Sequence, residues 1–375
     1  MKTGIAPNER WDALDYLRGL SIIGMLLHLS TGDWGHLFKH LSHAQWHGFH
    51  LLDMVAPAFL FCVGAAIPIS LENSLLAGVS RQTVALRILK RTLTMLAIGL
   101  FLNGFPQFDL AHLRIPGVLQ RIGLCYFLVG MFVLAVPRPA LTGATAVAIL
   151  LGYAALLHFV PVPGFGAPRY DPVGSWPTYL DRAIFSADHL FIYGVKTDGA
   201  VTYDPEGLLS TLPACFNLLA GVLTAYCYRK RLWRQPLIVA GATGITFTVA
   251  ALVLDAWIPI NKPIWTSSFA LLSTGFSLLV LALLSAIPEA PARKWLFPAK
   301  VFGANALLAF ILVSMLAALL DMPVAGTQSI RQLGNSALLP LLGPYQAALA
   351  FALICLFIYF LFLRHCYKRR WFLKL

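Results

Sequence analysis

The stretch LLDMVAPAFLFCVGAAIPISL, residues 51–71, decides the fold class. It is almost uniformly apolar, with Asp53 near its start. A helix needs roughly 20 such residues to cross the hydrocarbon core of a bilayer. Because lipid offers no partners for backbone polar groups, an apolar run of this length is expected to be helical. The stretch therefore predicts a membrane-spanning helix with one carboxylate at its mouth.

Similar runs fill the rest of the chain. The chain of 375 residues is 58% hydrophobic and 12% charged, with a mean hydropathy of +0.74. A water-soluble domain cannot hide that much apolar side chain. We expect an all-α polytopic membrane protein with about ten transmembrane helices in one domain, 1–375. Its further runs lie at 14–29, 84–102, 116–136, 140–160, 207–228, 237–257, 265–287, 301–320 and 347–363.

The basic residues predict an orientation. If the N-terminal segment 1–13 is cytoplasmic, 20 of the 28 Lys and Arg residues fall inside, and 11 of the 16 Asp and Glu residues fall outside. The C-terminal tail, 364–375, is then also cytoplasmic, and 161–206 is the longest extracytoplasmic loop. The N-terminus carries no cleavable signal pattern, so the first run is expected to be retained.

The charge and the cysteines exclude some partners. The net charge of +12 comes from short basic caps between apolar runs, so we expect a lipid bilayer and no nucleic acid as partner. The six cysteines show no CxxC spacing and lie mostly within or at the ends of apolar runs. We expect no disulfide and no cysteine metal site.

The unusual polar residues gather on the expected outer side. Six of the ten histidines lie between positions 28 and 50. Ionisable residues at membrane depth are costly and by default suggest a functional site. The site is therefore expected to open outward, and its candidates are His28, His36, His40, His43, His47, His50, Asp53, Arg114, Gln120, Arg121, Asp204, Glu206, Asn261 and Lys262.

Several motifs occur in the order found in one family. They are LDYLRGL (14–20), HAQWHG (43–48), DMVAPAFLFCVG (53–64), RIPGVLQRIG (114–123), YDPEG (203–207) and WIPINK (257–262). With these motifs the chain, from about residue 12 onward, resembles the heparan-alpha-glucosaminide N-acetyltransferase family. The resemblance implies a transmembrane acetyltransferase with acetyl-CoA as co-substrate, a terminal glucosamine acceptor and a functional histidine at His43. It also implies a bacterial inner-membrane member without the N-terminal lumenal domain of the animal proteins, and a homodimer would fit it.

Acetyl transfer to an amine explains why such residues are needed. The ammonium must lose a proton, and the tetrahedral oxyanion must be stabilised. His43 suits the base, because an imidazole titrates near neutral pH. It could instead accept the acetyl group itself. Asp53 is a plausible partner that holds the imidazole tautomer or binds the acceptor ammonium.

The remaining candidates each have a structural alternative. Donor binding is assigned to Arg114, Gln120, Arg121 and Asn305, although an arginine near a span end can simply snorkel and Asn305 can bond a neighbouring helix. Acceptor binding is assigned to Trp46, Asp204, Glu206, Asn261 and Lys262. Alternatively, Asp204 and Glu206 begin a helix, Asn261 and Lys262 form a turn, and Trp46 belongs to an interfacial belt.

The spacing of the histidines also admits a metal site. His36 and His40, like His43 and His47, have the i,i+4 spacing that places two imidazoles on one helix face. The segment also contains several glycines, and no carboxylate or cysteine set accompanies the pairs. We therefore expect no metal.

Two departures from the family pattern bear on the substrate. The family tends to carry an asparagine where this chain has His28-Leu29-Ser30, and a polar or acidic pair where it has Ser314-Met315. Other classes stay open: an amino-sugar or oligosaccharide permease, an O-acyltransferase of an envelope glycan, or a non-catalytic membrane subunit.

Overall fold

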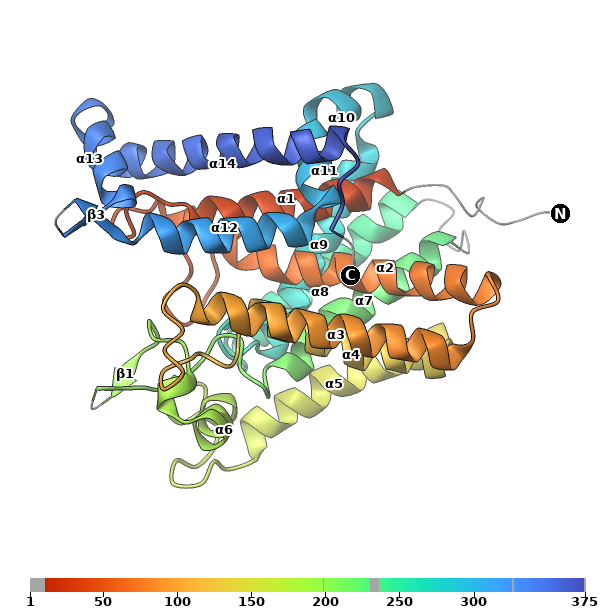
Figure 1. Cartoon of the computed structure of the whole chain (residues 1–375). Helices are drawn as coiled ribbons and strands as arrows, with labels where there is room; N and C mark the ends of the chain where they lie inside the picture. The colour runs from red at the N-terminus through yellow and green to blue at the C-terminus, as the bar shows by residue number, and fades with distance from the viewer. Residues whose placement is uncertain (1–10, 198, 230–235, 326, 374–375) are drawn as a thin grey trace.

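The protein is a bundle of helices that run broadly alongside one another (Figure 1). The computed structural model describes residues 11–197, 199–229, 236–325 and 327–373. The helices are α1 (Asp12–Leu29), α2 (Val55–Leu76), α3 (Arg81–Gly104), α4 (Val118–Ala135), α5 (Pro139–Phe159), α6 (Trp176–Phe185), α7 (Thr211–Arg229), α8 (Pro236–Leu254), α9 (Ser267–Ala286), α10 (Glu289–Trp295), α11 (Phe297–Ala304), α12 (Ala306–Leu320), α13 (Ile330–Leu342) and α14 (Pro344–Lys368).

Short strands and 3-10 turns lie in the connections between the helices. Two antiparallel hairpins, β1 (Lys196–Thr197) with β2 (Ala200–Val201) and β3 (Pro323–Ala325) with β4 (Gln328–Ser329), are the strands of the described residues. Three 3-10 turns complete the elements: η1 (Lys39–Leu41), η2 (Leu51–Met54) and η3 (Ala187–His189). The expected loop 161–206 therefore contains α6, η3 and the first hairpin.

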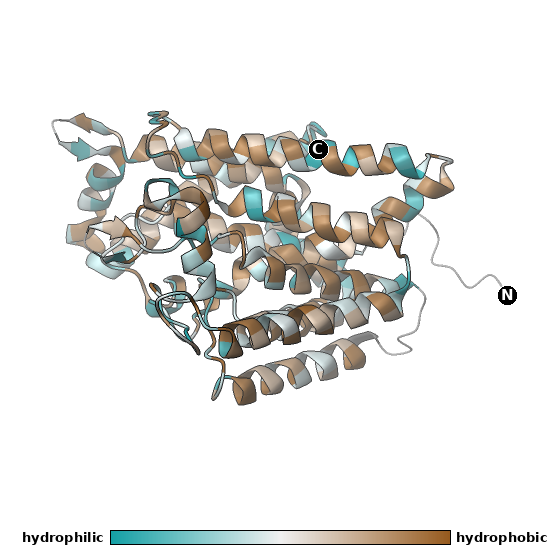
Figure 2. Cartoon of the chain, turned by 90° about the horizontal axis from the view of Figure 1, so that it is seen from below, coloured by the Kyte–Doolittle hydropathy of each residue, from teal (hydrophilic) through white to brown (hydrophobic). Residues whose placement is uncertain are grey.

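The predicted all-α multi-pass class is confirmed. A helix occupies each expected run, and six helices are long and apolar enough to cross a membrane, with up to seven if the bent pair α11 and α12 is one span. The helices α1 and α3 do not pass this test, and each carries charged residues within its apolar run. Length and composition thus support six or seven spans of the ten expected. Hydrophobic residues dominate the long helices, and hydrophilic ones gather at their ends and in the loops (Figure 2).

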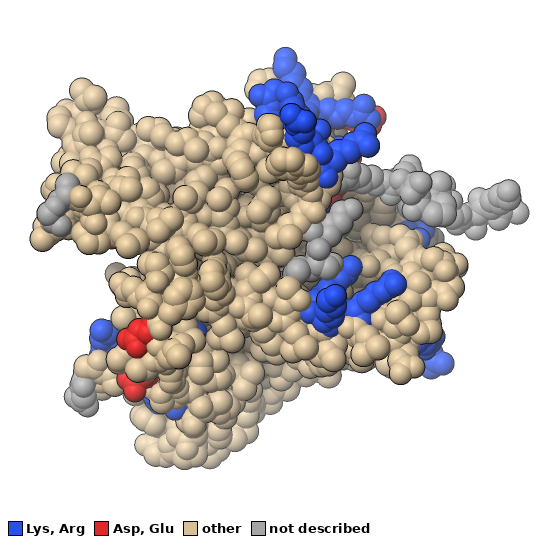
Figure 3. Space-filling view, in the orientation of Figure 1, with Lys and Arg blue, Asp and Glu red and all other residues tan. Residues whose placement is uncertain are grey.

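Two packing groups form the bundle. One core cluster joins α2, α4, α7 and α9, and another joins α1 to α11, α12 and α14. In Figure 1, α14, α1 and α12 lie above α3, α4 and α5. On the face shown in Figure 3, Lys and Arg gather mainly toward the end where α10 lies, and acidic side chains mainly toward β1.

The contact between α2 and α7 depends on glycine. A Cβ atom added to Gly221 would lie 2.1 Å from the carbonyl oxygen of Phe61 and 2.8 Å from the backbone nitrogen of Ala65. A Cβ at Gly64 would lie 2.0 Å from the carbonyl oxygen of Leu218. Small residues allow two membrane helices to approach closely and gain dispersion contacts.

We expect Gly221→Ala to destabilise the protein, because backbone atoms on α2 would have to move. Overpacking of this kind typically costs about 1–3 kcal/mol in the free energy of unfolding. Thermal unfolding in detergent would measure the loss. Gly152→Ala on α5 is the matched control, since no atom lies within 4 Å of its added Cβ. Equal midpoints for the two variants would contradict the close α2–α7 contact.

Candidate active site

His43 and Asp53 form a pair at the start of the second expected span. The Nδ1 atom of His43 lies 2.7 Å from Oδ1 of Asp53. The other carboxylate oxygen accepts hydrogen bonds from the backbone nitrogens of Ala44, at 3.2 Å, and His50, at 2.8 Å. Only 1% of the Asp53 side chain is exposed, against 41% for His43. The buried carboxylate is therefore fixed, and it orients an accessible imidazole.

This pairing sets the tautomer of His43. A carboxylate accepts hydrogen bonds and does not donate them, so Nδ1 of His43 carries the proton of the neutral ring. The lone pair is left on Nε2. Burial lowers the pKa of His43 and the nearby Lys262 ammonium lowers it further, against the opposing effect of Asp53. His43 therefore has a preference for the neutral form, with Nε2 as its basic nitrogen.

Lys262 brings a distant segment to the pair. Its Nζ atom lies 2.9 Å from Nδ1 and 3.3 Å from Nε2 of His43, and 3.3 Å from Oδ1 of Asp53. The lysine comes from the connection between α8 and α9, and burial lowers its pKa. The predicted grouping of His43, Asp53 and Lys262 is thus realised as one cluster of direct contacts.

A second charged group lies beside it. Arg114 donates to both carboxylate oxygens of Asp204, at 2.8 and 2.6 Å, and to Glu206 at 2.5 Å. Asp204 is fully buried and Glu206 is 16% exposed. Burial acts to raise the pKa of Glu206, but the Arg114 guanidinium outweighs it and the pKa is lowered. One forked arginine therefore binds both carboxylates.

The segment that holds Asp204 and Glu206 is a turn. Residues 204–207 precede α7, which begins at Thr211, so the alternative that these acids start the helix is wrong. The turn is stabilised by its own acid, since Oδ1 of Asp204 accepts from the backbone nitrogen of Glu206 at 2.8 Å. Its geometry directs both carboxylates toward Arg114.

A cavity of about 250 Å³ unites these groups. Its wall comes from α1, α2, α3, α4 and α12 and from the connections that hold the charged residues. The predicted site residues that line it are His43, Arg114, Gln120, Glu206 and Lys262. His28, Asn103 and Ser314 add further polar groups to the wall.

A second, mostly apolar cavity of about 230 Å³ adjoins the first. The two share Met25, Leu119 and Phe310 in their linings. Arg91 of α3 lines the far part of the apolar cavity and donates to the hydroxyl of Tyr126 at 3.2 Å. The two cavities therefore share part of their walls, and His43 lines the first of them.

Asn305 lies at the break between α11 and α12, which are bent by 85°. Its Nδ2 donates to the carbonyl oxygen of Trp371 at 2.8 Å, and its Oδ1 accepts from the backbone nitrogen of Leu373 at 3.1 Å. Leu373 in turn lines the apolar cavity. Asn305 therefore holds the C-terminal segment against the apolar cavity, where we predicted a direct donor contact or a bond to a neighbouring helix.

Arg121 and Gln120 bond to the segments that form the cavity walls. Nη2 of Arg121 donates to Ser210 Oγ at 2.5 Å, and its guanidinium lies over the Trp265 ring at 4.8 Å. Gln120 lines the cavity and donates to the carbonyl oxygen of Ile115 at 3.0 Å. Arg121 is 3% exposed and does not line the cavity.

Asn261 and Trp46 are engaged with backbone. Nδ2 of Asn261 donates to the carbonyl oxygen of Trp46 at 2.9 Å, and its Oδ1 accepts from Ile264 at 3.0 Å. Nε1 of Trp46 donates to the carbonyl oxygen of Tyr170 at 2.7 Å, and its ring packs edge-on against Tyr203. Neither side chain lines the cavity that holds His43. Asn261 instead ties the Lys262 segment to the loop that carries His43.

The histidine loop lacks the helix that the metal alternative requires. Between α1 and η2 the described chain is irregular apart from η1, so the i,i+4 pairs do not share a helix face. His36 pairs with Asp33 at 2.7 Å, and His43 pairs with Asp53. Among the described residues, no group of three or more His, Cys, Asp and Glu is placed to hold a metal ion.

Sequence reasoning missed two polar residues around the site, Arg91 and Asp181, and it named His28 without assigning it a role. His28 lines the cavity, and Arg91 lines the adjoining one. Asp181 of α6 is 1% exposed, accepts from the Leu208 nitrogen at 2.8 Å, and has a pKa raised by burial to about 7. His28 alone gave a signal, as a departure from the family pattern.

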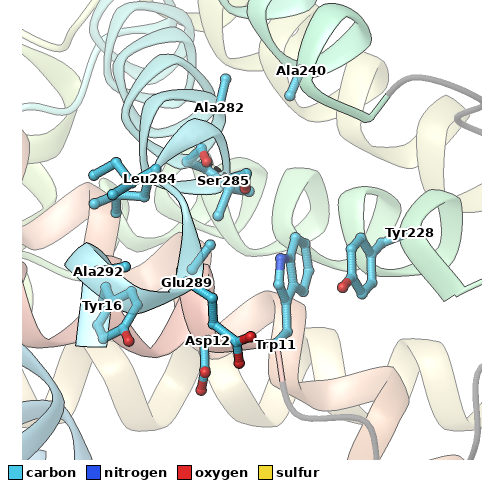
Figure 4. Close-up of a pocket in the computed structure, with 13 residues that line it drawn as sticks. Trp11, Asp12, Tyr16, Tyr228, Ala240, Ala282, Leu284, Ser285, Glu289 and Ala292 are labelled. Atoms are coloured by element: carbon cyan, nitrogen blue, oxygen red, sulfur yellow. Dashed lines mark hydrogen bonds between the residues drawn. The ribbon is translucent and has the colours of Figure 1, made fainter. Parts of the chain in front are cut away.

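A larger cavity, of about 400 Å³, lies elsewhere in the bundle. It is lined by residues of α1, α7, α8, α9 and α10, and the rings of Trp11 and Tyr228 stack 4.1 Å apart beside it (Figure 4). Asp12 and Glu289 add two carboxylates to its lining. None of the predicted site residues lines it.

These features define a class: an all-α multi-pass membrane protein with a carboxylate-oriented histidine at the head of a charged cavity. Within that class, the chain belongs to the family described as heparan-alpha-glucosaminide N-acetyltransferase, catalytic, which matches residues 10–256. Most of the cavity residues fall inside this range, including His43, Arg114 and Glu206.

Two curated relatives are similar to most of the chain. The heparan-alpha-glucosaminide N-acetyltransferase of Homo sapiens is 26% identical over 351 residues, covering 80% of this chain and 52% of the relative. That of Mus musculus is 26% identical over 354 residues, covering 81% and 53%. The chain therefore spans about half the length of the relatives it matches.

Proposed function

We propose that the protein is a transmembrane acetyltransferase that moves acetyl from cytoplasmic acetyl-CoA to the amine of a glucosamine-type sugar on the other side of the membrane. The observation that carries the proposal is the contact of His43 with buried Asp53 and with Lys262 at the head of the cavity. Family membership supports the reaction class.

The two adjoining cavities are the proposed donor path. The pantetheine arm of acetyl-CoA is long and narrow, and it suits a path with apolar walls that ends at a polar centre. Arg91 stands at the far part of this path and is a suitable partner for a donor phosphate. Gln120 contacts the donor near its reactive end. Asn305 acts on the donor through the C-terminal segment that it holds.

The acceptor binds at the outer end of the cavity. Glu206 is the carboxylate that lines this end, and an anion there attracts an ammonium. Arg114 and Arg121 keep the segment 204–210 in place. Trp46, Asp204 and Asn261 act on acceptor binding indirectly, because they position neighbouring backbone and side chains. Lys262 contacts the acceptor directly.

In this proposal His43 is the catalytic residue, either as a general base or as a nucleophile. Its Nε2 lone pair removes the proton from the acceptor ammonium, and the free amine attacks the thioester carbonyl. In the alternative route, Nε2 attacks first and carries the acetyl group to the amine. In both routes Asp53 stabilises the imidazolium or acyl-imidazole that forms, because it bonds Nδ1–H.

The charge pattern supports the sidedness. We propose ten crossings with both termini in the cytoplasm, because basic residues then lie inside and the cavity head outside. The grouping of Lys and Arg toward α10 in Figure 3 agrees with this orientation. A bacterial inner membrane is the proposed location, and the homodimer stays a prediction.

We expect a pH effect from Lys262. As a base, His43 works when neutral, so activity is present above its pKa and is lost as the pH falls through it. Burial is the larger cause of the lowered pKa of His43, and the Lys262 ammonium is the second. In Lys262→Met the pKa of His43 rises, and the acid limb of kcat/KM against pH moves upward by roughly 1 on the pH scale. A limb that stays in place would contradict the base role.

The matched control for this prediction is Lys196→Met. Lys196 is an exposed residue of β1, outside the cavity lining. This variant removes one positive charge from the same outer region and is expected to leave the limb unchanged. A shift shared by both variants would indicate a general surface-charge effect.

The proposed function is tested by acetyl transfer in detergent. Purified protein with acetyl-CoA and glucosamine is expected to form N-acetylglucosamine and to release CoA thiol in equal amounts. If glucosamine instead crosses a membrane unchanged without acetyl-CoA, the protein is a permease. If a hydroxyl-bearing glycan is acetylated and glucosamine is not, it is an O-acyltransferase.

A further inference from the structure

We propose that Asp181 is a positioning residue for the sugar acceptor: its protonated carboxyl fixes the turn 204–207, which carries Glu206 to the cavity. The inference rests on the proposed function and deepens it, because it names the group that keeps the ammonium-binding carboxylate in place. Asp181 lies on α6, at the opposite end of the bundle from α10 (Figure 1).

The first observation is the contact between α6 and the turn. Oδ1 of Asp181 accepts a hydrogen bond from the backbone nitrogen of Leu208 at 2.8 Å. A Cβ atom added to Gly207 would lie 1.7 Å from Oδ2 of Asp181, so the carboxyl packs directly against the turn. Glu206, the residue before Gly207, lines the same cavity as His43. A shift of the Asp181 carboxyl therefore displaces the residue next to Glu206.

The second observation is that Arg121 of α4 holds the same turn. Its Nη2 donates to the carbonyl oxygen of Gly207 at 3.3 Å and to Ser210 Oγ at 2.5 Å. Nε and Nη1 of Arg121 are sealed from solvent and have no hydrogen-bond partner among the described residues. Oδ2 of Asp181 is likewise sealed and unpartnered. Gly207 thus contacts both residues, and in this arrangement their unpaired atoms do not bond to each other.

The third observation is the set of groups that face Asp181, which is only 1% exposed. The charged ones are Arg121 of α4, Asp204 of the turn and Arg182 of its own helix. Tyr153 of α5 is a further titratable neighbour. Arg182 is committed elsewhere, because it donates to two backbone carbonyl oxygens at 2.6 Å. Asp181 therefore has cations nearby but no hydrogen bond to any of them.

These surroundings favour the neutral carboxyl. Burial raises the pKa of Asp181 to about 7, and the Asp204 carboxylate adds to this effect. The Leu208 N–H and the two arginines act in the opposite direction. A buried carboxylate without a charge partner avoids the cost of desolvation by taking up a proton. Asp181 is therefore largely neutral below pH 7 and ionises as the pH rises above it.

Ionised Asp181 disturbs the turn. By formal charge, Arg114 and Arg121 already balance Asp204 and Glu206, so a third carboxylate leaves a buried negative charge uncompensated. That charge repels Asp204, and repulsion is strong where little water screens it. The turn relaxes, and Glu206 leaves the position from which it binds the acceptor ammonium.

The expected result in the wild type is an alkaline limb in the use of the acceptor. After allowance for the protonation of glucosamine itself, kcat/KM for glucosamine should fall about tenfold for each pH unit above the pKa of Asp181. The loss should appear in KM for glucosamine. KM for acetyl-CoA should change little, because the turn lies at the acceptor end of the cavity in the proposed function.

Asp181→Asn tests the charge, because asparagine has the shape of the neutral acid and does not ionise. Its amide oxygen still accepts from the Leu208 nitrogen. We expect wild-type KM for glucosamine below pH 7 and no alkaline limb above it. Asp188→Asn is the matched control, since Asp188 is an acid of η3 in the same loop and lies outside the cavity lining. This control should keep the wild-type limb.

Asp181→Leu separates the hydrogen bond from the charge. Leucine cannot accept from the Leu208 nitrogen, which is then left unpaired, so KM for glucosamine should rise by about tenfold at every pH. If this variant does not fold, the comparison of Asp181→Asn with the wild type still decides the proposal.

Thermal unfolding in detergent gives a readout that needs no acetyl transfer. The pKa of Asp181 in the folded protein, about 7, lies above the ordinary value of 3.8. A proton bound more tightly by the folded state stabilises it, and this stability is lost as the pH rises through the folded pKa. The unfolding midpoint of the wild type should therefore fall relative to that of Asp181→Asn as the pH rises through about 7.

The two readouts distinguish the levels of inference. Equal alkaline limbs in Asp181→Asn and the wild type would overturn the role of Asp181, and so would midpoints with equal pH dependence. A wild type that transfers no acetyl group would refute the proposed function. The midpoints would then decide whether Asp181 holds the turn in its neutral form.

Discussion

His43→Ala is expected to reduce kcat for acetyl transfer by about 10²- to 10⁴-fold. The variant removes the Nε2 lone pair that the cavity presents and leaves Asp53 without its imidazole partner. The expected residual rate comes from binding the two substrates together. If His43 is the nucleophile as well, the loss should reach the upper end of the range, because the covalent route disappears.

The two routes can be separated on the same variants. Incubation of the wild type with radiolabelled acetyl-CoA and no acceptor should leave label on the protein if an acetyl-histidine forms. His43→Ala should then carry none. His112→Ala is the control, since His112 is a largely exposed residue that pairs with Asp109 elsewhere. Activity in His43→Ala within a few fold of the wild type would refute the assigned centre.

Asp53→Asn is expected to lower kcat by about 10⁴-fold. Asparagine fits the space and its oxygen still accepts from Ala44 and His50. Its NH₂ group then faces Nδ1 of His43, which must become an acceptor. The ring proton moves to Nε2, where the lone pair is required, and an inverted tautomer typically costs about 10⁴ in rate.

A second His–Asp pair provides the control for this variant. Asp33 bonds Nδ1 of His36 at 2.7 Å, the same distance as in the His43–Asp53 pair, yet it is 37% exposed. Asp33→Asn changes a similar pair outside the cavity and should leave kcat unchanged. Equal activity in Asp53→Asn and the wild type would show that His43 does not depend on a fixed tautomer.

Much of the site follows from charge placement along the chain. Residues that are costly in a membrane gather on one side of the expected topology, and this placed His43, Asp53 and Lys262 among the candidates for one site. The direct contact of the histidine with a lysine 219 positions away comes from the structure. The ion pair of Arg114 with Asp204 and Glu206 was not predicted, because the arginine was assigned to the donor and the two acids to the acceptor.

The roles of Trp46, Asn261 and Asn305 depend on local geometry, which the spacing of residues along the sequence does not reveal. Trp46 and Asn261 are polar and close in space to His43, but their side chains satisfy backbone groups. The run 301–320 reads as one apolar segment, yet it breaks at Asn305, whose amide binds the C-terminal segment. A single asparagine within an apolar run gives no indication of which backbone it will bond.

The fold was predictable in class and less so in detail. Apolar runs specify helices because lipid-facing backbone has no other way to satisfy its hydrogen bonds. Apolar runs do not specify how many of these helices cross the membrane. In α1 and α3, charged residues interrupt the apolar character, although Ile22 and Leu26 of α1 and Val84 and Ile88 of α3 pack in the core.

The most direct test of the account uses sealed proteoliposomes that hold glucosamine inside and receive radiolabelled acetyl-CoA outside. The account predicts labelled N-acetylglucosamine in the lumen, in wild type and not in His43→Ala, with no acetyl-CoA crossing intact. Luminal glucosamine that leaks out unchanged, or label that reaches the sugar only after detergent opens the vesicles, would contradict transfer across the membrane.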